Sequence, residues 1–348
     1  MEFIFELIFE IIIELLSYKK IKPWIRYTIL AIIMTLYIIL GAMLTYFAFG
    51  AKKMYVMKII AIALNVLIIV FFIKMLKKTK GVDEVYKKTI FIDIDLTLKD
   101  LEQEISLKNI NAIKNAKLRG HRIILASGRP YEFVRDVAKM VGADNLLIAS
   151  NGAEIINFKT NEIIFQNVLD EDIIRDFYNL AKEYKLNLFF NTPKKRFSTF
   201  YNKDCAEITE NNIESIIKQN KISQIVIVHP KFEVMKLVRK KIKTLNNINI
   251  TNESKSLTEN KESAEYYYID ISSKNISKGN AILRLLDYLN IENKNTIAIG
   301  DSYNDISMAE VVETFVAVDN AVAELKQKSH HITSSCLDDG VAKYLDNL

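Results

Sequence analysis

The chain has few of the residues that cross-link, kink or loosen a polypeptide. Its 348 residues include two cysteines, four prolines and ten glycines. Cys205 and Cys336 are too few for a disulfide framework, and they lack the Cys/His spacing of a zinc site. Low glycine and proline content, with 50% hydrophobic residues, excludes collagen-like and wholly disordered chains. We therefore expect a folded protein of a reducing compartment.

A strong charge of either sign is also absent. The chain has 47 Lys and Arg against 42 Asp and Glu, which gives a net charge of +5. This excess is too small to indicate binding to a polyanion, so we expect no nucleic-acid partner.

Long hydrophobic runs, in contrast, are present, and they lie before residue 80. No residue is charged from Tyr27 to Ala51, and only Lys58 is charged from Met54 to Ile73. Each run is long enough to cross a hydrocarbon layer of ~30 Å. The sequence therefore predicts a transmembrane hairpin within residues 21–80, with spans at 27–49 and 54–75. Residues 27–75 would contact the lipid bilayer.

The flanks of this hairpin predict its orientation. Lysines and arginines gather before the first span and after the second, which by the positive-inside rule places both ends in the cytoplasm. We expect a multi-pass protein of the cell membrane whose N-terminus and whose domain after residue 80 are cytoplasmic. Residues 1–20 form a predicted amphipathic helix with an acidic stripe. It either lies in the membrane interface or packs on another membrane helix, including by self-association through residues 1–16. The stripe consists of Glu2, Glu6, Glu10 and Glu14.

After residue 80, short apolar runs alternate with segments of helical spacing. This alternation predicts an α/β fold, a Rossmann-like core with a parallel sheet covered by helices. The core comprises residues 81–165 and 263–348, and an inserted α+β domain occupies 166–262. The predicted strands are 89–93, 122–126, 146–149, 296–299 and 315–318, and the predicted helices are 107–119, 131–141, 277–289 and 306–312.

Polar residues follow several of these strands. Because ligands of open α/β sheets bind at the carboxyl ends of the strands, the side chains there should meet on one rim. Carboxylates at that density repel one another unless a cation is present, and oxygen ligands suit Mg²⁺. A cation beside a lysine and a hydroxyl group is suited to a phosphoryl group. The rim residues are Asp93, Asp95, Ser127, Lys278, Asp301 and Asp305.

Five motifs stand on this rim in one order: DIDLT, ILASGRP, SNGA, SKGNAI and GDSYNDISMA. Together they resemble the haloacid dehalogenase (HAD) superfamily. The inserted segment between the second and third family motifs is similar to the type IIB cap of its Cof-type phosphatases. The resemblance covers about residues 88–348 and leaves the N-terminal segment outside.

The resemblance implies an aspartyl-phosphate mechanism and a role for each matching residue. Asp93 would be the nucleophile, and Asp95 would protonate the leaving group and then activate water. Ser127, Gly128, Lys278 and Asn304 would bind the phosphate. Mg²⁺ would be bound by Asp93, by Asp95 through its backbone carbonyl, and by Asp301, with Asp305 supporting this ligand set.

The expected function is a membrane-anchored, Mg²⁺-dependent phosphatase of small phosphorylated metabolites, either sugar phosphates or cofactor phosphates. Leu96 and Asp319 stand where the family usually has glycine, which leaves an alternative open: a catalytically weak HAD domain that acts as a membrane-bound binding or scaffold module. The insert would cover the rim and select substrates. Its candidate contacts are Phe189, Phe190, Asn191 and Arg196, whose facing the sequence does not decide.

Overall fold

The computed structural model describes residues 86–254, 257 and 265–348, together with the helical positions Ile32, Thr35 and Ile39. The helix expected at 1–20 and the hairpin expected at 21–80 otherwise lie outside the described residues. Within the part of the chain that the structure describes, no helix is both long and apolar enough to cross a membrane. Tyr86–Leu348 forms one compact unit, and the following description concerns this unit.

The core is an eight-stranded sheet in the order β14-β13-β12-β1-β2-β3-β4-β5. The strands from β14 to β3 run parallel, and β4 and β5 add an antiparallel hairpin at one edge. The strand bounds are β1 Thr89–Ile92, β2 Arg122–Ala126, β3 Leu146–Ala149, β4 Glu154–Asn157, β5 Glu162–Gln166, β12 Thr296–Gly300, β13 Thr314–Val318 and β14 His331–Thr333.

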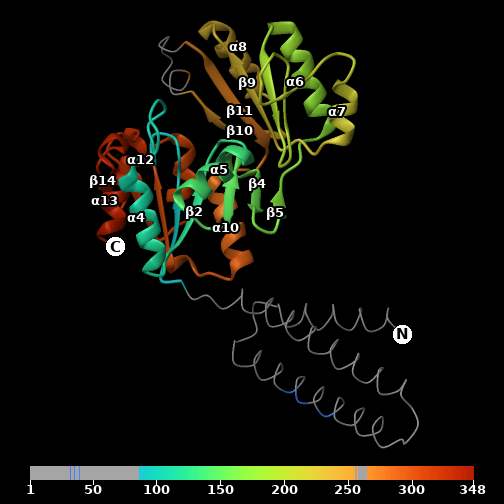
Figure 1. Ribbon diagram of the computed structural model, residues 1–348. Coiled ribbons are helices and arrows are strands. Elements are labelled where there is room, and N and C mark those ends of the chain that lie inside the picture. Colours follow the sequence, from blue (N-terminus) through green and yellow to red (C-terminus); the bar gives the residue numbers. More distant parts are fainter. Residues whose placement is uncertain (1–31, 33–34, 36–38, 40–85, 255–256, 258–264) are drawn as a thin grey trace, which may run out of the picture. The chain divides into compact units, whose positions relative to one another are not determined.

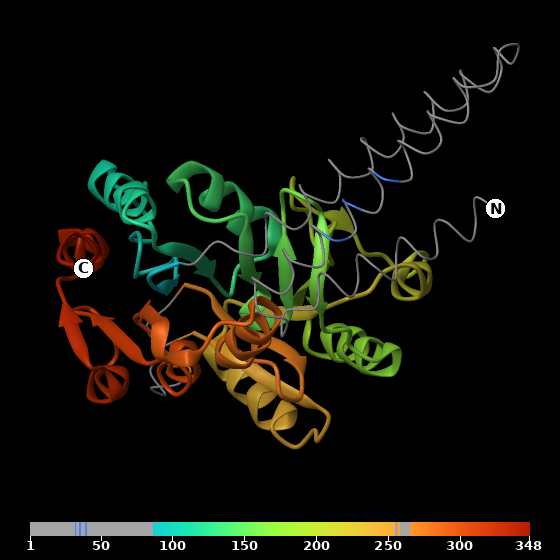
Figure 2. The same ribbon diagram turned by 90° about the horizontal axis from the view of Figure 1, so that it is seen from below.

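Helices cover both faces of this sheet, which explains why its central strands are continuous apolar runs. One group of helices packs together on one face and a second group on the other (Figure 2). The first group is α4 (Leu107–Leu118), α5 (Tyr131–Val141) and α13 (Gly340–Asp346), and the second is α10 (Lys278–Leu289), α11 (Ile306–Ala309) and α12 (Ala323–Lys328).

The start of α10 is fixed by a cap. The Ser277 hydroxyl accepts a hydrogen bond from the backbone N–H of Asn280 at 3.1 Å, which satisfies one of the free donors of the first turn. Lys278 is therefore the first residue of the helix, next to the strand ends. Helix α11 ends at Ala309 instead of the expected residue 312, because Val311 and Val312 turn back onto the Met308 carbonyl before β13 begins.

The inserted domain, hereafter the cap, is built on a second, six-stranded sheet in the order β10-β11-β9-β6-β7-β8 (Figure 1). Its pairs are antiparallel except for β7 with β8. The bounds are β6 Asn187–Asn191, β7 Arg196–Ser198, β8 Ala206–Glu207, β9 Gln224–His229, β10 Ile248–Glu253 and β11 Tyr267–Ser273, with helices α6 Glu171–Tyr184, α7 Ile213–Gln219 and α8 Phe232–Ile242.

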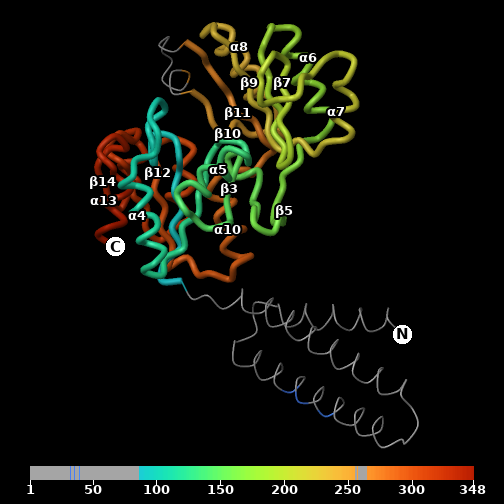
Figure 3. Tube along the Cα trace, in the orientation of Figure 1, coloured from blue at the N-terminus to red at the C-terminus, as the bar shows by residue number. Residues whose placement is uncertain are grey.

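The chain passes from the core to the cap after β5 and returns after β11, as the tube in Figure 3 shows. The two crossing segments are joined, because the Ser273 hydroxyl donates a hydrogen bond to Asn167 Oδ1. The second sheet thus continues to Ser273, whereas the sequence placed the end of the insert at residue 262. Strand β11 pairs with β9 and β10 along its length, and this pairing assigns it to the cap.

Candidate active site

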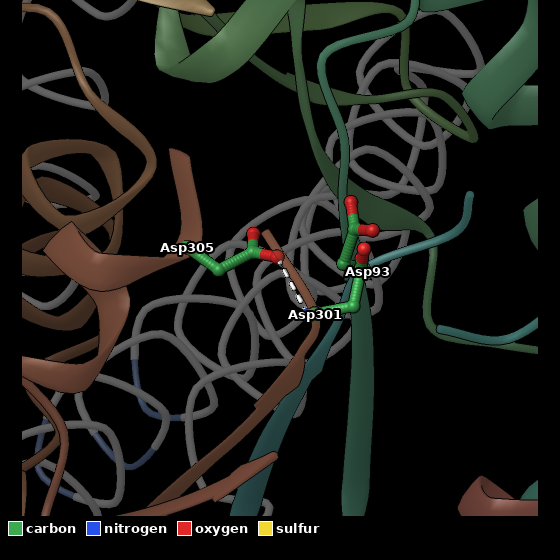
Figure 4. Close-up of side chains that lie close together, drawn as sticks. All are labelled: Asp93, Asp301 and Asp305. Atoms are coloured by element: carbon green, nitrogen blue, oxygen red, sulfur yellow. Dashed lines mark hydrogen bonds between the residues drawn. The ribbon is translucent and has the colours of Figure 1, made fainter. Parts of the chain in front are cut away.

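The side chains that follow β1 and β12 meet at the carboxyl edge of the core sheet. These two strands are parallel neighbours, and the backbone N–H of Asp93 continues their pairing by donating to the Ile299 carbonyl at 3.0 Å. Asp93, Asp301 and Asp305 are all buried, and one carboxylate oxygen of each lies within 4.8 Å of the others. Figure 4 shows the three carboxylates converging from these two strand ends.

Lys278 provides the positive charge inside this cluster. Its ammonium group donates to Asp93 Oδ1 at 2.5 Å and to Asp305 Oδ1 at 2.7 Å, and its side chain is 1% exposed. Burial alone would lower the pKa of Lys278, but Asp305 and Asp93 together raise it above its ordinary value. Lys278 is therefore a fixed cation beside the carboxylate predicted to be the nucleophile.

The three carboxylates are held differently. Both oxygens of Asp305 are occupied, one by Lys278 and the other by the backbone N–H groups of Asp301 and Ser302 at 2.9 and 3.1 Å. Asp301 accepts a hydrogen bond from the Thr97 hydroxyl at 2.9 Å. Asp305 thus fixes the loop, whereas Asp93 and Asp301 also line the cavity described below.

This cluster fits a divalent cation. Three buried carboxylates share one lysine, so about two negative charges remain without a cation from the described residues. Burial, offset in part by Lys278, raises the pKa of Asp93 to about 7. Burial and the neighbouring carboxylates Asp305 and Asp93 raise the pKa of Asp301 well above its ordinary value. Such crowding of oxygen donors is relieved by a hard cation such as Mg²⁺.

Asp95 lies on the cavity wall but outside the buried cluster. Its carboxylate is paired with Arg129 through two hydrogen bonds, from Nε at 2.8 Å and from Nη2 at 2.9 Å. The Arg129 guanidinium also lies 5.2 Å from the centre of the Phe133 ring. Arg129 thus offsets the charge of Asp95 while it also lines the cavity.

Ser127 and Gly128 follow β2 on the same rim and line the cavity. Ser127 is buried, and its hydroxyl accepts a hydrogen bond from the backbone N–H of Arg129 at 3.2 Å. A Cβ atom at position 128 would lie 2.9 Å from the Asn151 side-chain oxygen. The Asn151 amide thus occupies the space above Gly128, and a larger residue at position 128 would have to displace it.

Asn151 comes from a turn of left-handed residues after β3. Ser150, Asn151 and Gly152 have φ values of 51°, 55° and 96°, and this turn packs on the start of α10, where a Cβ on Gly152 would lie 2.2 Å from the Ser277 carbonyl oxygen. The Asn151 side chain accepts from Asn304 Nδ2 at 2.9 Å and donates to Asp270 Oδ2 at 2.9 Å.

The chain Asn304–Asn151–Asp270 joins the core to the cap, because Asp270 lies on β11. Asn304, predicted to bind phosphate, therefore directs its amide to Asn151, although it lines the cavity as well. Burial, opposed by the hydrogen bond from Asn151, raises the pKa of Asp270 to about 7.

A cavity of about 520 Å³ lies between the rim and one face of the cap sheet. Of the four cap residues proposed from the sequence, three line it: Phe189, Asn191 and Arg196. Phe190 points the other way and is buried in the hydrophobic core of the cap. The cap face contributes further lining residues that the sequence reading missed: Val226, Val228, Asn252, Tyr266, Tyr268 and Asp270.

Alternation along β9 and β11 is the signal that could have identified these residues. In QIVIVH and YYIDISS, every second residue is buried against the cap helices, so the residues between them face the rim.

The structure also shows the backbone conformation at the two positions that depart from the family pattern. Leu96 has a φ of 60°, the left-handed region that favours glycine. Asp319 is not among the residues with positive φ, so no such constraint applies there.

Comparisons with known proteins agree with this architecture. A family model of haloacid dehalogenase-like hydrolases matches residues 90–345. The chain is 31% identical over 274 residues to "Putative phosphatase YxeH" of Bacillus subtilis, covering 75% of this chain and 98% of the relative. It is 27% identical over 261 residues to 5-amino-6-(5-phospho-D-ribitylamino)uracil phosphatase YcsE of the same organism, covering 75% and 95%.

Among solved structures, a haloacid dehalogenase-like hydrolase from Bacteroides thetaiotaomicron superposes with a TM-score of 0.65 at 25% identity, covering 76% of this chain and 99% of that one. The match includes both the core and the cap. The chain therefore belongs to the haloacid dehalogenase-like hydrolase family, and it is a phosphatase.

Proposed function

We propose that the chain is a Mg²⁺-dependent phosphatase that hydrolyses small phosphorylated metabolites through an aspartyl-phosphate intermediate. The observation that carries this proposal is the buried Asp93–Lys278 pair, in which Asp93 lines the cavity. A lysine at 2.5 Å keeps Asp93 available as a carboxylate although its burial favours the neutral form.

The reaction takes two steps. An oxygen of Asp93 attacks phosphorus, the bond from phosphorus to the leaving oxygen breaks, and Asp95 gives that oxygen its proton. Asp95, now a carboxylate, then takes a proton from water, whose oxygen attacks phosphorus and releases phosphate and the Asp93 carboxylate. The pair with Arg129 matches the ionised form of Asp95 that the second step uses.

The remaining rim residues bind and stabilise the phosphoryl group. The Ser127 hydroxyl, the backbone of Gly128 and the Lys278 ammonium would hold its oxygens. Asp93, Asp301 and the Asp95 backbone carbonyl would bind Mg²⁺, with Asp305 positioning the loop. The bound cation would offset the charge of the phosphoryl group as it is transferred.

The substrate class is a small sugar phosphate or cofactor phosphate. A cavity of about 520 Å³ accommodates a leaving group of that size, and aromatic rings on both walls, Phe133 and Phe189, suit an apolar or ring-shaped part. The relative named for a phosphoribitylamino-uracil substrate is an example of such a compound.

We also propose that residues 27–75 anchor the enzyme in the cell membrane, with the N-terminus and the catalytic unit in the cytoplasm, and that residues 1–16 pack in or on the membrane, including by self-association. The uncharged run of the sequence supports this proposal. Reporters fused at residues 1 and 348 should both report the cytoplasm, and Ala51→Cys should be labelled only from outside. Labelling of Ala51→Cys from the cytoplasm would refute the hairpin.

Covalent trapping tests the mechanism. The full-length chain is mixed with Mg²⁺ and an excess of an aryl phosphate, quenched in acid during turnover, digested and examined by mass spectrometry. We expect phosphate on the peptide that contains Asp93, and none when Mg²⁺ is replaced by a chelator. Turnover with phosphate on another residue, or with none on the protein, contradicts the mechanism.

A further inference from the structure

One face of the cap sheet carries a cation without a carboxylate partner. Strands β6 and β7 pair so that Asn191 lies opposite Arg196, and Phe189 is two residues before Asn191 on the same face. All three side chains line the cavity opposite the catalytic rim. Arg196 therefore faces the part of a substrate that leaves, and not the phosphoryl group held by the rim.

The guanidinium of Arg196 is held in place by neutral groups. Its Nε donates to Asn191 Oδ1 at 3.0 Å, and Asn191 is itself oriented by donating to Gln224 Oε1 at 2.7 Å. One face of the guanidinium lies 4.6 Å from the centre of the Phe189 ring. Among the described residues, its two Nη groups have no hydrogen-bond acceptor and no carboxylate within 4 Å. Four N–H donors thus remain available to a ligand.

The other guanidinium of the cavity wall and the carboxylate of the cap face already have partners among the described residues. Arg129 is paired with Asp95 through two hydrogen bonds, and Asp270 accepts from Asn151. Burial lowers the pKa of Arg196, and the more distant groups Cys205, Glu132 and Asp204 raise it again only in part, so the guanidinium is desolvated without an anion that fully offsets it. A partly buried cation without an anionic partner costs free energy of desolvation, and an anionic ligand that pairs with it would offset this cost.

We propose that Arg196 is the specificity determinant that binds a second anionic group, a carboxylate or a second phosphate, on the leaving part of the substrate. This inference rests on the proposed phosphatase reaction and narrows its substrate class to phosphomonoesters with two separated anions. The planar fork of a guanidinium matches two oxygens of such a group, and the amide and ring contacts fix the fork in advance. A stacked neutral ring is the less favoured ligand, because one face of the guanidinium is already covered by Phe189.

Paired substrates test this assignment. 3-Phosphoglycerate and glycerol 3-phosphate share a carbon skeleton and differ by a carboxylate, and fructose 1,6-bisphosphate and fructose 6-phosphate differ by a phosphate. Full-length wild type, Arg196→Gln, Arg196→Lys and the control Lys194→Gln are compared. Lys194 is exposed and lies two residues from Arg196, and Lys194→Gln removes the same charge as Arg196→Gln.

We expect wild type to prefer the second-anion member of at least one pair. Arg196→Gln should lower kcat/KM for that member by about ten- to a hundredfold, mainly through KM, and should lower it much less for the partner compound. Arg196→Lys should recover part of the loss, and Lys194→Gln should leave the preference unchanged. The proposal would be overturned if Arg196→Gln lowered kcat/KM equally for both members of each pair. It would also be overturned if Arg196→Gln lowered kcat/KM for flavin mononucleotide, a phosphate with a neutral ring, as much as for the second-anion member.

Binding separates this inference from the proposed reaction. Calorimetric titration of the same compounds needs no turnover, so a chain without phosphatase activity that still binds the second-anion member through Arg196 refutes the reaction and supports the assignment. A chain that hydrolyses all the compounds but shows no Arg196-dependent preference refutes the assignment alone. If none of the compounds binds, the assignment is refuted as well.

Discussion

The core sheet and the cap sheet present functional side chains to the same cavity in different ways. In the core, parallel strands end at one edge, and the charged residues just after them, Asp93 and Asp301, gather there beside Lys278 at the start of α10. In the cap, antiparallel strands lie over the cavity, and alternate residues along each strand face it, among them Phe189, Arg196 and Tyr268. The first arrangement concentrates charge at one point, and the second spreads mixed contacts over a surface.

This difference separates two properties of the enzyme. A concentrated cluster acts as a unit, so removing one member affects every substrate. A spread surface makes contacts that differ from one substrate to the next, so removing one member changes the ranking of substrates. Core variants should therefore change rate without changing preference, and cap variants the reverse.

The largest effect is expected for Asp93→Asn. An amide cannot form the acyl phosphate, so kcat should fall by ~10³-fold or more for all substrates alike. Steady-state turnover of an aryl phosphate and of the metabolite pairs measures this. Asp100→Asn, a change in the same loop but outside the cavity, is the control and should retain kcat. Substantial residual turnover by Asp93→Asn would contradict its role as the nucleophile. A loss of kcat that depends on the leaving group would contradict the separation of rate in the core from preference in the cap.

A buried carboxylate outside the cavity lining should cost stability without serving the reaction. Glu154 on β4 is fully buried, and burial raises its pKa from an ordinary 4.5 to about 7. A group whose pKa is higher in the folded state stabilises the fold below its unfolded pKa, and this contribution is lost as pH rises through about 7. At pH 8 the loss amounts to about 3 kcal/mol.

Glu154→Gln removes this titration. The variant should melt at a higher temperature than wild type at pH 8 and at a similar or lower temperature at pH 5. Glu162→Gln, at an exposed position on the neighbouring strand β5, should show neither change. If Glu154→Gln leaves the difference in melting temperature between pH 5 and pH 8 unaltered, this pH dependence does not come from Glu154.

Asn151 tests the contact between the two regions. Asn151→Ala removes the link between Asn304 and Asp270 and leaves the Asp270 carboxylate buried without that donor. Because the link fixes the cap against the rim and not any one substrate group, kcat/KM should fall by roughly tenfold for all substrates, with their ranking retained. Asn280→Ala, which removes a local side-chain contact on α10, is the control. A changed ranking would show that Asn151 contacts substrate directly.

Much of the rim was predictable because several of its residues directly follow a buried strand in the sequence. The strand order and the rule that parallel strands end at one edge were enough to predict that three residues meet there: Asp93, Ser127 and Asp301. The partner of Arg129 was not predictable, because a side chain after a strand end can turn either to substrate or to a neighbouring carboxylate.

The cap was harder to predict for a physical reason. Asp270 and Tyr268 lie in a seven-residue strand that contains apolar residues on one face and mixed residues on the other. From its sequence alone, such a strand is easily assigned to the core sheet instead of the cap sheet. Its pairing with β9 and β10 decides the assignment, and this pairing joins segments far apart in the sequence. The boundary expected at residue 262 and the missed lining residues have this same cause.

The smallest effect concerns Leu96, which lies in the loop after β1 and lines the cavity. Its φ of 60° is a left-handed conformation that costs a leucine about 1 kcal/mol relative to glycine. The backbone contacts that impose this conformation do not depend on the side chain, since Leu96 N–H donates to the Lys99 carbonyl and its own carbonyl accepts from Asn320, both at 2.7 Å.

Leu96→Gly should therefore retain the loop and raise the free energy of unfolding by about 0.5–1 kcal/mol, measured by urea denaturation. Leu101→Gly is the matched control, because Leu101 also lines the cavity and is not among the residues with positive φ. Without strain to relieve, glycine there should only destabilise, by increasing the entropy of the unfolded chain. If Leu96→Gly destabilises the protein as much as Leu101→Gly does, the packing of the Leu96 side chain outweighs its backbone strain, and leucine at this position stabilises the loop that carries Asp95.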